Sequence, residues 1–154
     1  MRPGASEWRA RASGLYTVVR LEADPNIAVG AIPWGPFAAI SAELVEGRFD
    51  EQRPEPVEGL SADSAFMKQP VSVISPGRSA LPTLQPDQPI LVVGRDIHQH
   101  LFAREAVDRL RSEYADVLVV DMGWPSADRK YADVATFGAS RLMGGVLLNW
   151  LHAH

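Results

Sequence analysis

Two short apolar runs, separated by an amphipathic segment, constrain the fold of this chain more than any other feature. Residues 90–94 read ILVVG and residues 117–120 read VLVV, and polar residues interrupt neither run. Continuous runs of this kind are typical of parallel strands that are covered on both faces. Between them, residues 101–114 place apolar side chains at helical spacing and charged side chains on the opposite face. The pattern predicts a β-α-β unit with two parallel strands.

Further elements flank this unit on both sides. Residues 15–21 (LYTVVRL) are rich in β-branched and aromatic side chains and predict a strand. Residues 134–137 predict a short third strand, and residues 140–151 predict an apolar closing helix. The glycines at 144 and 145 each cost this helix about 1 kcal/mol relative to alanine, which predicts close packing there. We therefore expect an α/β fold, a layered sandwich with a mainly parallel sheet flanked by helices.

The middle of the chain is rich in proline. Nine of the twelve prolines lie between Pro33 and Pro89, where they disfavour long helices and central strands. Within this region, ELVEG at residues 43–47 is echoed by EPVEG at residues 55–59, and the sequence between them is polar. We expect an exposed proline-rich loop or an inserted tract at about residues 42–70.

Length and composition set the limits for the remaining interpretation. The 154 residues predict one domain over residues 15–151, after a disordered or start-site extension at 1–14 and before a tail at 152–154. With no cysteine, the chain has no disulfide scaffold, thiolate metal site or cysteine nucleophile. Fifteen Lys and Arg against 19 Asp and Glu argue against nucleic acid and anionic membranes as partners. Without an apolar run of about 20 residues or a secretory signal, we expect a cytoplasmic protein.

The candidate site residues follow the predicted strands. Ligands of open α/β sheets bind beyond the carboxyl ends of the strands, so polar residues at these positions are the first candidates. We select five residues as candidates for a ligand site or a domain interface: Asp96, His98, Asp121, Trp124 and Arg141.

Each candidate has more than one interpretation. Asp96, His98 and His100 could ligate a metal, although helix capping and loop ordering by Asp96 and His98 is the more common role. Asp96 and Asp121 could form an acid/base pair, but loop carboxylates more often order the backbone or face water.

The aromatic and basic candidates have alternatives of the same kind. Trp124 could stack on a sugar face, but a tryptophan beside proline is more often a packed loop anchor. Ser140 predicts an N-cap for the last helix, and Arg141 could help that helix end to hold an anion. The chain has neither of the glycine-rich motifs that bind dinucleotides or nucleotide phosphates.

Three segments together resemble the C-terminal domain of family 3 glycoside hydrolases. VVGRDIHQH, VLVVDMGWP and ADVATFGASRLMGGVLLNWL occur in the family's order and spacing, and VVRLEADPNIAVGAIPWGPF resembles the opening of the same domain. The resemblance covers about residues 15–41 and 88–151, and it is strongest to the actinobacterial β-N-acetylglucosaminidase type.

The resemblance implies an accessory role for this chain. In the family, a preceding TIM-like barrel carries the nucleophilic aspartate, and in this branch an Asp-His pair on a barrel loop, in a KHFPGHG-type motif, supplies acid/base chemistry. No segment here matches that motif, and 154 residues cannot form a barrel of about 250 residues. The resemblance thus implies an accessory domain or split subunit of a hydrolase acting on N-acetylglucosaminides. Its partners would be the catalytic barrel and an N-acetylglucosamine-containing sugar, and it would contain no catalytic residue, metal or cofactor.

Three other interpretations stay open. The chain could be a free-standing α/β module that binds a carbohydrate or another small ligand beside Asp96 and Trp124. It could be a small hydrolase that uses Asp96 and Asp121. It could also be a structural remnant in which Trp34, Phe37 and Trp124 line an apolar face that once met a barrel.

Overall fold

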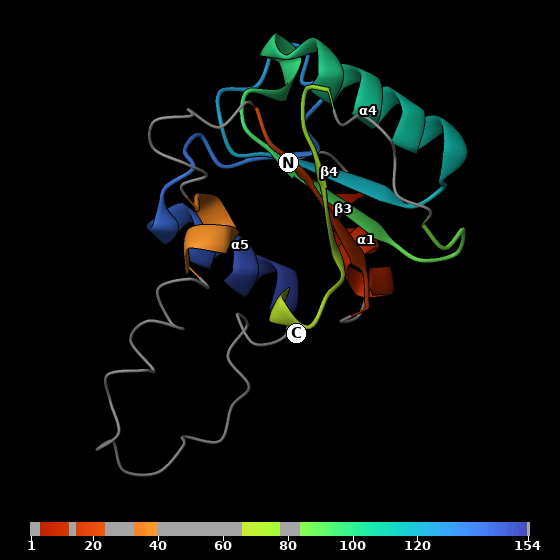
Figure 1. Ribbon diagram of the computed structural model, residues 1–154. Coiled ribbons are helices and arrows are strands. Elements are labelled where there is room, and N and C mark those ends of the chain that lie inside the picture. Colours follow the sequence, from red (N-terminus) through yellow and green to blue (C-terminus); the bar gives the residue numbers. More distant parts are fainter. Residues whose placement is uncertain (1–3, 13–14, 24–32, 40–65, 78–83, 154) are drawn as a thin grey trace.

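A five-stranded, all-parallel sheet forms the centre of the computed structural model (Figure 1). Its strand order is β2-β1-β3-β4-β5. The strands comprise β1 (Thr17–Leu21), β2 (Val71–Ile74), β3 (Ile90–Gly94), β4 (Val117–Asp121) and β5 (Val134–Ala135). From β1 the chain goes outward to β2 and then returns to the other side of β1 as β3, which creates a topological switch point between β1 and β3. The predicted α/β fold is confirmed.

The structure describes five parts of the chain, residues 4–12, 15–23, 33–39, 66–77 and 84–153. Most of the expected loop or inserted tract at residues 42–70 lies outside them. Within the described parts, no helix is long and apolar enough to cross a membrane.

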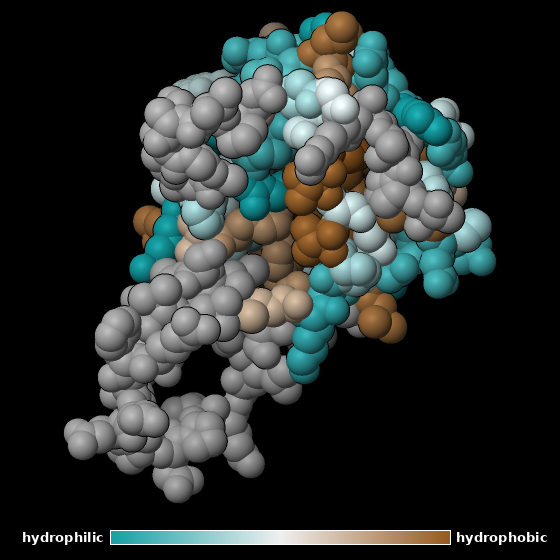
Figure 2. Space-filling view, in the orientation of Figure 1, coloured by the Kyte–Doolittle hydropathy of each residue, from teal (hydrophilic) through white to brown (hydrophobic). Residues whose placement is uncertain are grey.

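Helices cover both faces of the sheet, as the apolar strands require. Helix α4 (Leu101–Glu113) and the short 3-10 helix η1 (Ile97–Gln99) lie on one face, and α1 (Ala5–Ala12) and α5 (Arg141–His152) lie on the other (Figure 1). Successive strand residues point to opposite faces, so that Leu91 packs toward α5 whereas Val92 packs toward α4. Figure 2 shows mostly hydrophilic side chains over the outer side of α4, as expected of an amphipathic helix.

The observed elements match the sequence pattern in the C-terminal third and in β1, which lies within the strand predicted at 15–21, and they depart from it at β2. The strands at 90–94 and 117–121 and helix α4 form as predicted, and β5 is two residues shorter than its predicted segment. We did not predict β2. It is an edge strand with two exposed valines, Val71 and Val73, so it lacks the continuous apolar run that marks a central strand.

Both ends of the domain extend further than we expected. The expectation of disorder at residues 1–14 is wrong for α1, because Trp8 is only 2% exposed and its indole N–H donates to the carbonyl oxygen of Asp116 at 3.2 Å. His152, expected in the tail, is the last residue of α5. Its Nδ1 donates to the carbonyl of Leu148, and its Nε2 lies 3.2 Å from the hydroxyl of the buried Tyr16.

The glycine at 144 lets α5 approach a neighbouring segment. A Cβ atom added at Gly144 would lie 2.6 Å from the backbone nitrogen of Pro36, and closer still to the carbonyl group of Gly35. The amide of Gly35 also donates to the carbonyl of Ala139, just before α5, at 2.8 Å. The predicted close packing is confirmed at Gly144, whereas a Cβ atom at Gly145 would meet nothing within 4 Å.

These two neighbouring glycines give a matched test of the packing. We expect Gly144→Ala to lower the free energy of unfolding by about 1–3 kcal/mol, because a rigid backbone blocks the new methyl group. Gly145→Ala should instead raise it by about 0.5–1 kcal/mol through helix propensity. Urea unfolding of both variants measures the difference, and equal effects would contradict this account of the α5 contact.

Candidate functional site

The carboxylate of Asp121 joins the ends of the two central strands. Asp121 is the last residue of β4, and its Oδ1 accepts the backbone N–H of Asp96 at 2.9 Å and that of Gly123 at 2.8 Å. Its Oδ2 accepts the backbone N–H of Ile97 at 3.2 Å. The carboxylate therefore binds the donors at the start of η1, which follows β3, and a donor of its own loop.

Burial makes this carboxylate costly to ionise. Asp121 is 0% exposed, and its removal from water raises the pKa of the carboxyl above its ordinary value of 3.8. The three backbone donors act in the opposite direction and lower the pKa, whereas the nearby Asp96 raises it further. Because the burial effect is the largest, the net shift is upward.

Asp96 completes the link between the two loops. Its own backbone is left-handed, with φ of 49°, and its Oδ1 accepts the backbone N–H of Trp124 at 2.8 Å. Gly123 lies against it so closely that an added Cβ atom would sit 2.6 Å from the nitrogen of Asp96. Only glycine therefore fits at position 123 while Asp96 keeps its hydrogen bonds to Trp124 and Asp121.

The structure brings Asp96 and Asp121 together, with backbone N–H groups donating to both carboxylates. Both carboxylates accept backbone N–H groups, which is the loop-ordering role considered for them above. The expected capping role of the Asp96 side chain is wrong. Asp96 occupies the N-cap position of η1 but makes no side-chain cap bond, because the carboxylate of Asp121 already takes the free N–H groups there.

Trp124 points outward from this ordered loop. The expectation of a packed loop anchor is wrong, because the side chain is 70% exposed. Its ring contacts Phe137 edge to face, with ring centroids 5.5 Å apart, and Phe137 is itself 47% exposed. The guanidinium carbon of Arg129 lies 5.8 Å from the centroid of the Phe137 ring. We call Trp124, Phe137 and Arg129 the aromatic platform.

Backbone strain is concentrated around the platform. Among the described residues, the left-handed conformation is adopted by three that are not glycine, namely Asp96, Arg129 and Phe137. They belong to the loops that leave β3 and β4 and to the turn after β5, which all lie at the carboxyl edge of the sheet. Such residues cost free energy and are typical of binding and catalytic sites, so the platform marks this edge as the candidate site.

The other predicted site residues lie outside this hydrogen-bonded group. His98 lies in η1, where its carbonyl accepts from Arg104 at 2.8 Å and its buried Nδ1 has no partner among the described residues. The described residues contain no group of three His, Asp or Glu side chains placed to hold a metal. Ser140 caps α5 through the N–H of Met143, which confirms the predicted N-cap, and Arg141 is exposed in the first turn.

Sequence reasoning missed a second polar cluster, at the switch point. Trp34 is buried, and its Nε1 donates to both oxygens of Glu22, at 3.1 and 2.9 Å. Arg20 pairs with the same carboxylate, and its guanidinium lies 4.4 Å from the centroid of the Phe37 ring. The expected apolar face of Trp34, Phe37 and Trp124 therefore does not form, because Trp34 and Phe37 pack inward. The β-strand pattern of residues 15–21 hid Arg20, and no motif marks Glu22.

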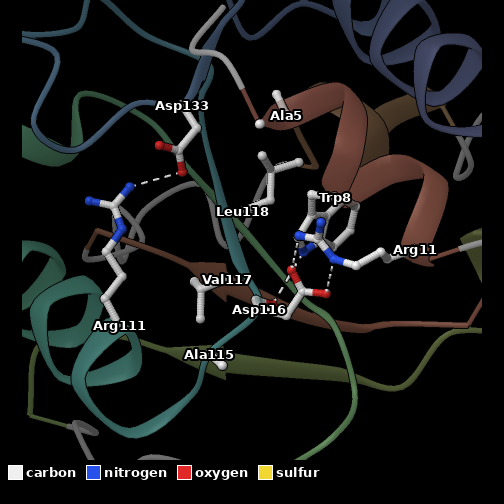
Figure 3. A pocket seen from close by; sticks show the side chains of 10 residues that line it. Ala5, Trp8, Arg11, Arg111, Ala115, Asp116, Val117, Leu118 and Asp133 are labelled. Carbon is white, nitrogen blue, oxygen red and sulfur yellow. Dashed lines mark hydrogen bonds and ion pairs between the residues drawn. The ribbon is translucent and has the colours of Figure 1, made fainter.

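A pocket of about 380 Å³ lies at the opposite, amino edge of the sheet, between the first turn of α1 and the start of β4 (Figure 3). Arg11 and Arg111 stand on opposite sides of it. Arg11 binds both oxygens of Asp116, at 2.7 and 3.2 Å, and Arg111 binds Asp133 at 2.8 Å. Its charged side chains thus already bind one another.

Comparison with protein-family models, curated proteins and solved structures finds no match to this chain.

The Asp121 network gives a direct stability test. We expect Asp121→Asn to lower the free energy of unfolding by about 1–3 kcal/mol at neutral pH, because an amide can accept at only one atom and leaves a buried backbone N–H unpaired. Urea unfolding measures the loss. The exposed Asp87→Asn serves as a control for removal of one charge, and a similar loss in both variants would contradict the role of the network.

The same residue sets a pH dependence with a defined sign. Because its folded-state pKa is raised, the folded chain holds the Asp121 proton more tightly than the unfolded chain does. The resulting stabilisation is complete below pH 3.8 and is lost as pH rises through the folded-state pKa. We therefore expect the stability of the wild type relative to Asp121→Asn to fall as pH increases across this window. A relative stability that rises with pH would show that the backbone donors outweigh burial.

Proposed function

We propose that this chain is the accessory C-terminal domain of a family 3 glycoside hydrolase that acts on N-acetylglucosaminides. In this proposal a catalytic barrel, in the same or a separate polypeptide, performs the chemistry. The chain folds beside that barrel and contributes no nucleophile and no general acid. The sequence resemblance suggests the family. The geometry of the carboxyl edge supports the proposal that the barrel, and not this chain, supplies the catalytic groups.

The state of the two aspartates carries the proposal. Glycoside hydrolysis with retention needs two groups about 5 Å apart on either side of the scissile bond. Asp96 and Asp121 are neighbours, but Asp121 is fully buried and accepts three backbone N–H groups. It cannot reach a substrate without breaking the loops that hold Asp96, so the pair supports the fold rather than catalysis.

The architecture is compatible with the same role. The resemblance implies an α/β sandwich, and this chain forms a parallel sheet with helices on both faces. The segment TFGASR contains the turn from β5 into α5, in which Phe137 is left-handed and Ser140 caps the helix. The most distinctive part of the resemblance thus lies in a turn with specific backbone requirements.

Activity of the isolated chain tests the absence of catalytic groups. We expect the purified chain to release no chromophore from an aryl N-acetyl-β-glucosaminide above the rate of a heat-treated sample, because neither aspartate can act on the bond. Asp96→Asn should behave identically to the wild type in this assay. Hydrolysis at enzyme-like rates that Asp96→Asn abolishes would overturn the proposal in favour of a small hydrolase.

The family assignment needs a positive test as well. A barrel of about 250 residues requires about a kilobase of coding DNA, so the region upstream of Met1 should encode one with a KHFPGHG-type motif. Co-expression of that barrel with this chain should yield a complex that cleaves the same glycoside. The absence of such a barrel both upstream and elsewhere in the genome, or a barrel that does not bind the chain, would contradict the accessory role.

A further inference from the structure

The aromatic platform combines an open ring face with unused hydrogen-bonding groups. Trp124 is 70% exposed and meets Phe137 edge to face, so at least one face of the indole is open to solvent. Within the described residues, the indole Nε1–H of Trp124 has no acceptor. The Oδ2 atom of Asp96 likewise has no donor, since the bond to Trp124 uses Oδ1. The guanidinium of Arg129 lies over the Phe137 ring and has no carboxylate partner among the described residues.

The backbone that presents Trp124 and Asp96 is held in position before any ligand arrives. The backbone N–H of Trp124 is fixed on Asp96, and Asp96 is in turn fixed by its own N–H on Asp121. At Gly123 the two loops lie so close together that there is no space between them for a side chain. A site whose backbone is ordered by a buried network, while its side chains remain unsatisfied, is preorganised for a ligand.

The chemistry of these groups selects the class of ligand. An open indole face takes an apolar, flat surface, while an N–H donor, a carboxylate acceptor and a guanidinium nearby require partners that both donate and accept. The pyranose ring of a sugar has this combination, because its axial C–H groups form an apolar face and its hydroxyls lie around the rim.

We propose that Trp124 is the stacking residue of a carbohydrate-binding subsite, with Asp96 Oδ2 and Arg129 as hydroxyl partners and Phe137 as the support for the indole. The subsite deepens the function proposed above and rests on it for the sugar to be tested. It lies at the carboxyl edge beyond β4 and β5, where α/β sheets bind ligands. We assign it binding only, because Asp96 is the one carboxylate that the proposal places at the platform and glycoside hydrolysis needs two such groups.

The test is a titration of the full chain with N,N′-diacetylchitobiose, followed in ¹H–¹⁵N spectra through the indole signals. We expect the Trp124 indole and the backbone amides of its loop to shift and saturate. Trp124→Ala should weaken binding by about tenfold or more while leaving the other amide signals in place, because its hydrogen bond to Asp96 uses the backbone. Leu142→Ala removes another exposed apolar side chain, at 76% exposure, and should bind as the wild type does.

A second variant separates binding from folding. Phe137 is left-handed, so Phe137→Gly relieves strain and should not reduce the free energy of unfolding, yet it should weaken binding by removing the support of the indole. Absence of saturable shifts, or binding that Trp124→Ala leaves unchanged, would overturn the subsite. A Trp124→Ala variant that impairs only association with a barrel would overturn it too and assign the platform to protein docking. Sugar binding by a chain for which no partner barrel is encoded, upstream or elsewhere, would support the subsite and contradict the accessory role.

Discussion

The buried carboxylate of Asp121 is the interaction on which the carboxyl edge of this domain depends. A parallel sheet leaves the ends of its strands joined only through loops, and the loops after β3 and β4 need acceptors for their free N–H groups. One side chain supplies them, from the last residue of β4 to the first residues after β3. Asp96 then repeats the arrangement in the opposite direction by accepting from Trp124. The two central strands are thereby joined beyond their backbone ladder.

This arrangement decides what the edge can do chemically. An acid or base must exchange protons with a substrate, whereas the free energy of the Asp121 network comes from keeping its oxygens on backbone donors and away from water. A carboxylate in that position holds the two loops together, and it is poorly placed to exchange protons with a substrate. The loops that it clamps can therefore hold side chains such as Trp124 in solvent without collapsing onto them.

Sequence patterns predicted the parts of the structure that repeat regularly. The runs at 90–94 and 117–121 and the helix between them follow directly from periodicity, and the Ser140 cap follows from local chemistry. The edge strand β2 was missed because its exposed valines and flanking prolines resemble a loop. Helix α1 was missed because it is short and its large buried side chain, Trp8, bonds to a residue more than a hundred positions away in the sequence.

The candidate site was predictable in place but not in detail. Topology alone placed Asp96, Asp121 and Trp124 at one edge, because parallel strands end together. Which carboxylate caps η1 and whether Trp124 packs inward depend on distances of a few ångströms between loops, which spacing along the chain does not encode. Phe137 and Arg129 gave no signal, since left-handed conformations of such residues arise only from the folded context.

A contrast between the two ends of the sheet supports the choice of the carboxyl edge as the candidate site. At the amino edge, the arginines of the pocket bind the aspartates beside them, so a ligand would have to break existing ion pairs to enter. At the carboxyl edge, the buried carboxylate of Asp121 is satisfied by three backbone N–H groups, whereas the exposed groups of the platform have no such partners among the described residues. Satisfied charges around a cavity stabilise a fold, whereas ordered but unsatisfied groups around an open ring lower the cost of binding. The aromatic platform is therefore the better candidate site. The ion pairs around the pocket at the amino edge stabilise the packing of α1 on the sheet.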